Sequence, residues 1–119
     1  MEDKPKTILE LIKPKIHVIE EDDSFDDDLE DFITMSLATL NQLGVGNSIV
    51  FDKDTTYEDF FTSDQTPETM NLAKSYIRMN VQMLFDTPAT GAVNSNNVAA
   101  VAQLEWRVGI SVSKYDEPK

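Results

Sequence analysis

The stretch that decides the fold is residues 66–107, TPETMNLAKSYIRMNVQMLFDTPATGAVNSNNVAAVAQLEWR. It contains two segments with the apolar spacing of amphipathic helices, joined by the turn-forming residues 86–91. Thr66 is suited to cap the first helix and Pro67 to its first turn, whereas Pro88 requires this helix to end before it. The stretch therefore predicts a helical hairpin.

The first helix of this hairpin carries apolar side chains on two sides. At about 100° per residue, one apolar line is made by Met70, Ala73, Ile77, Val81 and Leu84. The second line is made by Leu72, Tyr76, Met79 and Met83. One small core covers only one line, so we predict that the second line is a subunit interface. The alternative is that this helix is sandwiched inside its own bundle.

A second long helix is predicted in the first half of the chain. From about residue 25 to Leu43 the apolar positions form a single stripe with polar residues opposite, which is typical of a core helix. Nine acidic residues between Glu20 and Asp31 lead into it, and Ser24 is the predicted cap. Carboxylates at a helix N-terminus interact favourably with its positive end.

Shorter elements are predicted on either side of this helix. Thr7 is placed to cap a short helix that Pro14 ends. In the long connection over residues 47–65, residues 49–51 are predicted to form a short strand or a buried plug. Residues 56–61 of the same connection are predicted to form a helical turn with two aromatic side chains.

The end of the chain is predicted to be a helix followed by an extended tail. The helix is expected from about Ser95 to Gly109. Its apolar arc consists of Val98, Val101, Ala102, Leu104, Trp106 and Val108. Beyond Gly109 the apolar and polar residues alternate, which favours an extended arm over residues 110–119.

Together these elements predict an all-α fold. We expect a small helical bundle of about four helices, with a C-terminal helical hairpin, a long central loop and extended terminal arms. A chain of 119 residues fits a single domain, residues 1–119. Within it we expect an N-terminal arm and acidic segment over residues 1–24, a helical core over residues 25–109 and a C-terminal arm over residues 110–119.

The composition restricts the partners of the chain. Its 22 acidic and 10 basic residues give a formal net charge of −12, which argues against nucleic-acid binding because phosphate contacts depend on lysine and arginine. The absence of cysteine excludes disulfides and thiolate metal sites. No apolar run reaches the ~20 residues of a membrane helix, and the N-terminus does not resemble a signal peptide, so we expect a cytosolic product and no membrane partner.

No catalytic, cofactor or metal site is predicted. If a calcium-binding loop began at Asp22, its glycine position would be Asp27 and its closing glutamate position Ile33, so the acidic run does not fit. His17 is the only histidine, which leaves no basis for a histidine metal cluster or a catalytic triad. The glycines in residues 44–46 are interpreted as a helix stop. We therefore expect no enzyme activity and no cofactor.

One charged residue breaks the apolar pattern of the final helix. Glu105 falls inside its apolar arc, where a carboxylate is costly unless it is paired. We predict a buried ion pair between Glu105 and Arg78 of the preceding helix. The alternative is that Glu105 lies at the edge of the arc and reaches water.

Three short motifs in the last third carry a family resemblance. They are AKSYI at residues 73–77, LFDTP at residues 84–88 and AQLEWRV at residues 102–108. In this order and spacing the chain resembles the head-tail connector proteins of tailed bacteriophages, which are also described as neck adaptors or head-completion proteins.

The resemblance implies a structural component of the virion neck, at the interface of head and tail, that assembles in the host cytoplasm. It implies a homo-oligomeric ring, commonly of twelve copies, that docks on the portal protein and extends the DNA channel. The ring offers an attachment site to a stopper or tail-completion protein, and DNA passes through without specific binding. It also implies that the C-terminal arm reaches the portal, and we expect it to do so as an added strand. The residues assigned to this portal-binding tail are Ile110, Val112, Tyr115, Glu117 and Lys119.

The acidic composition fits a channel through which DNA must slide, because acidic side chains repel the duplex. The candidate channel-lining acids are Asp22, Asp23, Asp26, Asp27 and Asp28. An alternative function from another class is an acidic DNA mimic that inhibits a DNA-binding enzyme. A third alternative is a helical interaction module with no phage role.

Overall fold

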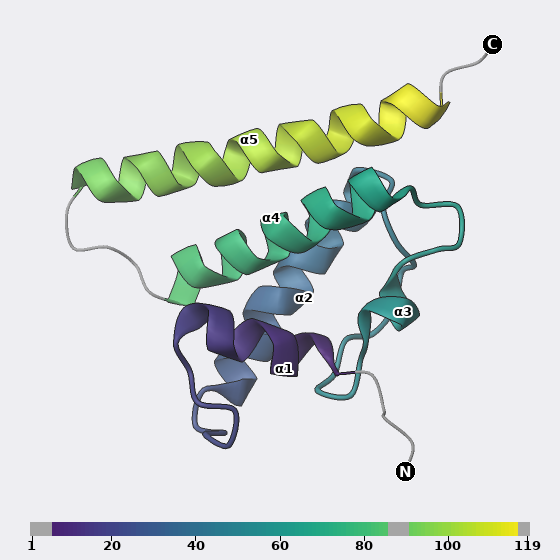
Figure 1. Ribbon diagram of the computed structural model, residues 1–119. Helices are drawn as coiled ribbons and strands as arrows, with labels where there is room; N and C mark the ends of the chain where they lie inside the picture. The colour runs from purple at the N-terminus through teal and green to yellow at the C-terminus, as the bar shows by residue number, and fades with distance from the viewer. Residues whose placement is uncertain (1–5, 86–90, 117–119) are drawn as a thin grey trace.

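The computed structural model describes residues 6–85 and 91–116, with side chains described for residues 6–85 and 98–112. This part of the chain is helical and contains no strand, so the predicted all-α fold class is confirmed (Figure 1). The elements in chain order are α1 (Ile8–Ile12), the 3₁₀ helix η1 (Lys13–Ile16), α2 (Asp26–Gln42), α3 (Tyr57–Phe60), α4 (Pro67–Phe85) and α5 (Gly91–Asp116). Within the described residues, none of these helices has the length and hydropathy needed to cross a membrane.

The predicted helical hairpin is confirmed by α4 and α5. The two helices lie side by side and run in opposite directions, and α2 packs against the other side of α4 (Figure 1). The beginning of α4 is as predicted, because the Thr69 amide donates to the Thr66 hydroxyl at 3.1 Å and Pro67 occupies the first helical position. The central helix of the fold is therefore α4, with α2 and α5 as its two neighbours.

The beginning of α2 differs in detail from the prediction. Ser24 does not cap the helix, because its amide donates to the Asp22 carboxylate at 3.0 Å and its hydroxyl donates to the same oxygen. The N-cap residue is Phe25, which has no capping side chain. The ring of Phe25 makes an edge-to-face contact with Phe85, with 5.1 Å between the centroids, so it ties the start of α2 to the end of α4.

The N-terminal segment is not an arm over its described part. Thr7 caps α1 as predicted and forms a capping box with Glu10. The apolar side chains that follow are buried in the common core: Ile8, Leu9, Ile12, Ile16 and Val18. A helix this short is unstable alone, so the packing of α1 on α2 and of the following η1 on α4 is what holds it.

The connection between α2 and α4 is irregular but packed. The predicted helical turn over residues 56–61 is confirmed by α3, whose Phe60 is fully buried. The strand predicted over residues 49–51 does not form. Ile49 and Phe51 pack against the core as a plug, whereas Val50 is 93% exposed.

The C-terminal arm predicted as extended is helical as far as the structure describes it. Helix α5 begins earlier than predicted and continues to Asp116 without ending at Gly109. A side chain at position 109 would lie 3.7 Å from Leu43, so Gly109 stands where α5 passes close to the end of α2. The alternation after residue 109 misled because Val108, Ser111 and Val112 also share one helical face, and this face is directed at the bundle.

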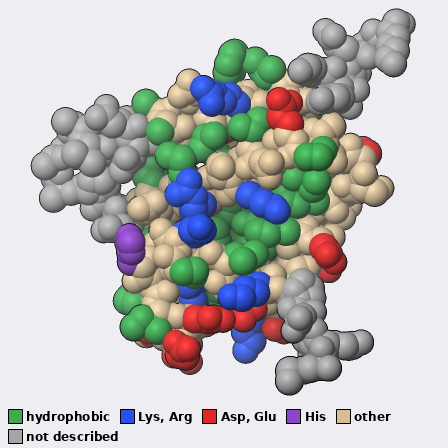
Figure 2. All heavy atoms as spheres, in the orientation of Figure 1, with side chains coloured by type: hydrophobic (Ala, Val, Ile, Leu, Met, Phe, Trp, Pro, Cys, Tyr) green, Lys and Arg blue, Asp and Glu red, His purple; other side chains and the backbone are tan. Residues whose placement is uncertain are grey.

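The charges are unevenly distributed over the surface. On the face that carries α1 and α4, Lys and Arg side chains surround a hydrophobic area, and Asp and Glu side chains lie mainly towards the edges (Figure 2). A chain with a net charge of −12 therefore still presents a locally basic face.

Candidate functional site

The second apolar line of α4 is covered largely within the chain. Tyr76 is only 4% exposed, and Leu72, Met79 and Met83 are half-buried against the core. Burial raises the pKa of the Tyr76 phenol, and the charge of Glu105 raises it further. The sandwiched helix, the alternative to a subunit interface, is thus what the structure favours for Tyr76. For the other three residues a subunit interface stays a prediction.

An exposed apolar stripe runs along the outer side of α5. Four residues at a spacing of four share this side: Val98, Ala102, Trp106 and Ile110. Trp106 is 66% exposed and Ile110 is 46% exposed, whereas Val101 and Val108 are buried against the bundle. The predicted apolar arc of this helix is therefore divided between a core face and this outer stripe. We call the four exposed residues the α5 stripe.

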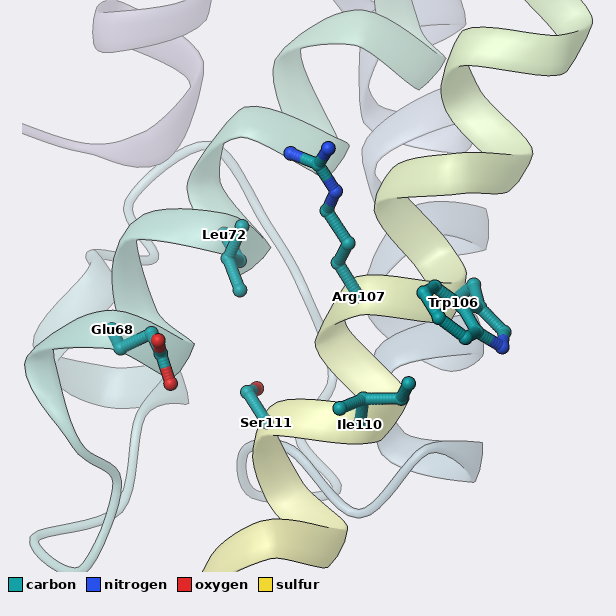
Figure 3. A pocket seen from close by; sticks show the side chains of 6 residues that line it. All are labelled: Glu68, Leu72, Trp106, Arg107, Ile110 and Ser111. Carbon is teal, nitrogen blue, oxygen red and sulfur yellow. The ribbon is translucent and has the colours of Figure 1, made fainter.

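Two residues of the α5 stripe, Trp106 and Ile110, border a groove of about 320 Å³ between α4 and α5. Its lining residues are Glu68, Leu72, Trp106, Arg107, Ile110 and Ser111 (Figure 3). The first two come from α4 and the others from α5, and the Arg107 side chain extends towards α4 (Figure 3). An apolar groove with a carboxylate and a guanidinium at its rim is suited to hold an apolar side chain of a partner protein.

The floor of this groove is fixed by hydroxyl groups. The Thr69 hydroxyl donates to the Ser111 hydroxyl at 2.9 Å, and the Ser111 hydroxyl donates to the Val108 carbonyl at 2.8 Å. Both side chains are buried, so α4 and α5 are joined in the interior by a satisfied polar contact. The contact was not predicted, because the sequence of a helix does not show which residue of a neighbouring helix a hydroxyl will face.

The residues assigned to the portal-binding tail fall into two groups. Ile110 is half-exposed at the groove, and Val112 is half-buried near the end of α2. The backbone of Tyr115 belongs to α5, but its side chain lies outside the described residues, as do Glu117 and Lys119 entirely. The described part of this tail is docked on the bundle as a helix, so it is not a strand awaiting a partner.

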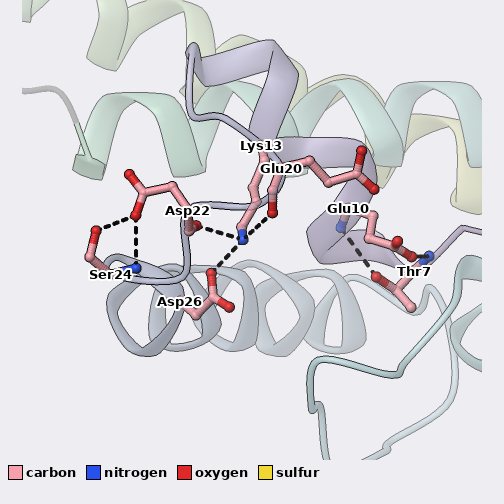
Figure 4. Close-up of polar contacts among 7 residues, drawn as sticks. All are labelled: Thr7, Glu10, Lys13, Glu20, Asp22, Ser24 and Asp26. Carbon is pink, nitrogen blue, oxygen red and sulfur yellow. Dashed lines mark hydrogen bonds and ion pairs between the residues drawn. The ribbon is translucent and has the colours of Figure 1, made fainter.

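A buried lysine organises the acidic segment. The Lys13 ammonium is 2.6 Å from an Asp26 carboxylate oxygen and donates to the carbonyls of Glu20 at 3.2 Å and Asp22 at 2.9 Å (Figure 4). Lys13 is only 4% exposed. Sequence reasoning missed this residue. The available signal was its position one helical turn after Leu9, on the apolar face of α1 and just before the acidic run.

This lysine separates the five candidate channel-lining acids into two groups. Asp26 pairs with Lys13, and the Asp22 carboxylate accepts hydrogen bonds from Ser24, which lower the pKa of Asp22. The other three candidates are exposed: Asp23, Asp27 and Asp28. Two of the five acids thus make contacts within the chain, and the other three are exposed.

The predicted ion pair between Arg78 and Glu105 does not form. Within the described residues, the only ion pair joins Lys13 and Asp26. Glu105 lies beside Tyr76, in a shallow depression between α2, α4 and α5, whereas Arg78 lines a groove between α1 and α4. Two residues correspond to about 200° of helix, so Arg78 and Tyr76 lie on opposite sides of α4. Glu105 is half-buried at the rim, as in the alternative interpretation.

No group of three or more His, Cys, Asp or Glu side chains in the described part of the chain is arranged to hold a metal ion.

Comparison with known proteins agrees with the resemblance in the last third and extends it. The sequence matches the family model described as phage connector protein over residues 8–115. No curated protein and no solved structure gives a match. The matched region begins at the first residue of α1 and ends in the last turn of α5. The chain therefore belongs to the phage connector protein family, which points to a structural role in the connection between the head and the tail of a phage.

Proposed function

We propose that this protein is an adaptor that assembles as a ring on the portal vertex, extends the DNA channel and offers the tail side an attachment site for a stopper or tail-completion protein. The proposal places the ring in the virion neck after assembly in the host cytoplasm. Family membership supports the connector role, and the ring, its copy number of about twelve and its position come from the resemblance to head-tail connectors.

The observation that carries the proposal is the α5 stripe. Trp106 is 66% exposed on a helix whose other face contributes the buried side chains of Val101, Val108 and Ser111. Large aromatic side chains are enriched at the centres of protein interfaces, and an exposed apolar row beside a groove is typical of a surface that a partner covers. We infer that the α5 stripe and the adjoining groove contact the portal, with Ile110 as the part of the predicted tail that takes part.

The acidic surface supports a channel that does not bind DNA. Exposed Asp27 and Asp28 lie in the first turn of α2, on a different helix from the α5 stripe, so one surface of the subunit can face DNA while another contacts protein. A DNA mimic needs carboxylates spread over its binding surface, whereas the face drawn in Figure 2 has a basic centre with acids mainly towards its edges. We therefore prefer the connector to the DNA mimic.

A complementation experiment in the phage tests the proposal. Trp106→Asp is supplied in place of the native protein, and purified particles are inspected for this protein and for tails. We expect tailless heads, because an aspartate in an apolar contact would disrupt portal binding. The matched control is Val50→Asp, which places the same charge at a 93% exposed apolar position in the connection between α2 and α3 and should leave particles normal.

Two results would contradict the proposal. One is the absence of the protein from the neck of wild-type particles. The other is normal tailed particles from Trp106→Asp when circular dichroism shows the variant to be folded. Copurification with a nuclease or polymerase instead of the portal would support the DNA mimic.

A further inference from the structure

A second groove, of about 310 Å³, lies between α1 and α4. Apolar and aromatic side chains form part of it, including Leu11, which is 36% exposed, and Tyr57. Three basic side chains also line it: Lys15, Lys74 and Arg78. No acidic residue lines this groove, although acidic residues outnumber basic ones by 22 to 10 in the chain. Figure 2 shows Lys and Arg side chains around a hydrophobic area on the face that carries α1 and α4.

The cations of this groove have no carboxylate partner in the described part of the chain. Lys15, Lys74 and Arg78 form no ion pair there. Lys74 lies over the ring of Tyr57 at 5.0 Å from its centroid, which keeps its charge beside the apolar part of the groove. An apolar groove with cations at its rim is complementary to a short segment that combines an apolar side chain with carboxylates.

The same chain carries such a segment among residues that do not line the groove. The turn of residues 19–23, which we call the acidic turn, exposes Ile19 to 70% and also exposes Glu20, Glu21 and Asp23. Its backbone is fixed, because the Asp22 amide donates to the Ile19 carbonyl at 2.9 Å and Lys13 binds two of its carbonyls from the protein interior (Figure 4). A turn already held in shape loses little conformational entropy when it binds.

We propose that the groove between α1 and α4 receives the acidic turn of a second copy of this chain. Ile19 enters the apolar part beside Leu11, and Glu21 and Asp23 meet Lys15 and Arg78. Because groove and turn are different patches, each copy uses its groove for one neighbour and its turn for another. Such a heterologous contact generates a ring when the rotation closes. The inference deepens the proposed function, since it specifies the contact between neighbours in the proposed ring.

Charge reversal on each side separately tests the contact. The groove variant is Lys15→Glu with Arg78→Glu, and the turn variant is Glu21→Lys with Asp23→Lys. None of these four side chains forms a hydrogen bond or ion pair with a described residue, so both variants should fold, which circular dichroism can verify. Self-association of the full chain is measured by sedimentation at low salt, up to millimolar protein.

We expect wild-type protein to associate weakly and to dissociate as salt increases. Each variant alone should associate at least about tenfold more weakly, because like charges then face each other in every contact. An equimolar mixture of the two variants should recover the wild-type association, since each reversed groove then meets a reversed turn. The control is Lys6→Glu with Lys53→Glu, which changes the net charge equally at exposed sites that do not line the groove, and should remain within about threefold of wild type.

The inference is overturned if the mixture fails to recover, if the control loses as much as the groove variant, or if wild-type protein stays monomeric throughout. These outcomes are separate from the test of the proposed function. If the protein forms a ring on the portal but the mixture of variants does not recover self-association, only this contact is wrong. If the mixture recovers self-association but the protein is absent from the virion neck, the contact stands and the proposed function is wrong.

Discussion

The buried hydroxyls of Thr69 and Ser111, 2.9 Å apart, connect the two helices of the C-terminal hairpin. The Thr66 hydroxyl donates to the Thr69 hydroxyl at 3.1 Å, and the Ser111 hydroxyl donates to the Val108 carbonyl. Each of these three hydroxyls therefore both donates and accepts a hydrogen bond, and that of Thr66 accepts from the Thr69 amide at the start of α4. The contact fixes the register of α5 on α4 and thereby the position of the α5 stripe.

We predict that Ser111→Ala lowers the free energy of unfolding by about 1–2 kcal/mol, because the buried Thr69 hydroxyl loses its acceptor. Thr69→Val should cost a similar amount. The double variant should cost less than the sum of the two, since each single variant already loses the hydrogen bond between the two hydroxyls. Urea unfolding of the four proteins measures this, and simple additivity would show that the two hydroxyls act independently.

The helical course of residues 110–112 predicts that a chain ending after Gly109 is less stable. The truncation removes Ser111 and Val112, whose methyl group lies at the end of α2, 3.3 Å from where a side chain at Gly44 would begin. We expect a loss of about 2 kcal/mol or more from the missing hydrogen bond and apolar contact. A chain ending after Asp116 keeps all of α5 and is the control. Equal melting temperatures would contradict this.

Replacing Lys13 should be among the costliest single changes at a charged residue. Lys13→Met leaves the Asp26 carboxylate without its partner and the carbonyls of Glu20 and Asp22 without their donor, and we expect a loss of roughly 2–4 kcal/mol. Asp26→Asn retains an oxygen that accepts from the ammonium, so its cost should be about 1 kcal/mol. Thermal unfolding of both variants gives the comparison, and equal losses would assign the effect to the ion pair alone.

The two glycines after α2 should differ in their tolerance of alanine. Both have positive φ, +92° at Gly44 and +82° at Gly46. A side chain at Gly46 would also enter the ring of the fully buried Phe60, whereas at Gly44 it would meet only a Val112 methyl group. We expect about 3 kcal/mol for Gly46→Ala and about 1 kcal/mol for Gly44→Ala. A reversed order in denaturant unfolding would contradict the packing of Phe60.

Tyr57 predicts a loss of stability at high pH. Burial raises the pKa of its phenol to about 12 from an ordinary value of 10.0, so between these values the unfolded chain loses a proton that the folded chain retains. Below pH 10 the free energy of unfolding is unaffected by this phenol, and towards pH 12 it should fall by on the order of 2 kcal/mol. Tyr57→Phe should show a smaller fall in the same range. If the free energies of unfolding of the wild type and of Tyr57→Phe fell in parallel over this range, the raised pKa of Tyr57 would be contradicted.

The hairpin and the core helix could be predicted because long apolar periods leave few alternatives. Thr66 and Pro67 mark the start of α4 locally, and the stripe of α2 needs no knowledge of its neighbours. The conformation of the tail, residues 110–119, could not be predicted in the same way. Six residues of alternation after Gly109 fit a strand, but Val108 and Val112 also fit one helical face, and only the packing against α4 decides.

The candidate site was less predictable because it depends on which side of each helix is covered. Tyr76 and Trp106 both occupy apolar positions in the sequence pattern, yet Tyr76 is 4% exposed and Trp106 is 66% exposed. The burial of Lys13 requires two carbonyls and a carboxylate from a turn that folds back on it, which no local pattern specifies. Arg78 and Glu105 were wrongly paired because the sequence does not tell which side of α4 faces α5.

The arrangement of α2, α4 and α5 has a kinetic consequence. Each of these helices packs mainly on the next long helix along the chain, so few distant segments must meet before the bundle forms. Domains with such local contacts fold on the order of microseconds to milliseconds. A subunit released from the ribosome would then be folded long before it encounters another copy, so the rate at which a multi-copy assembly grows should depend on protein concentration and not on folding.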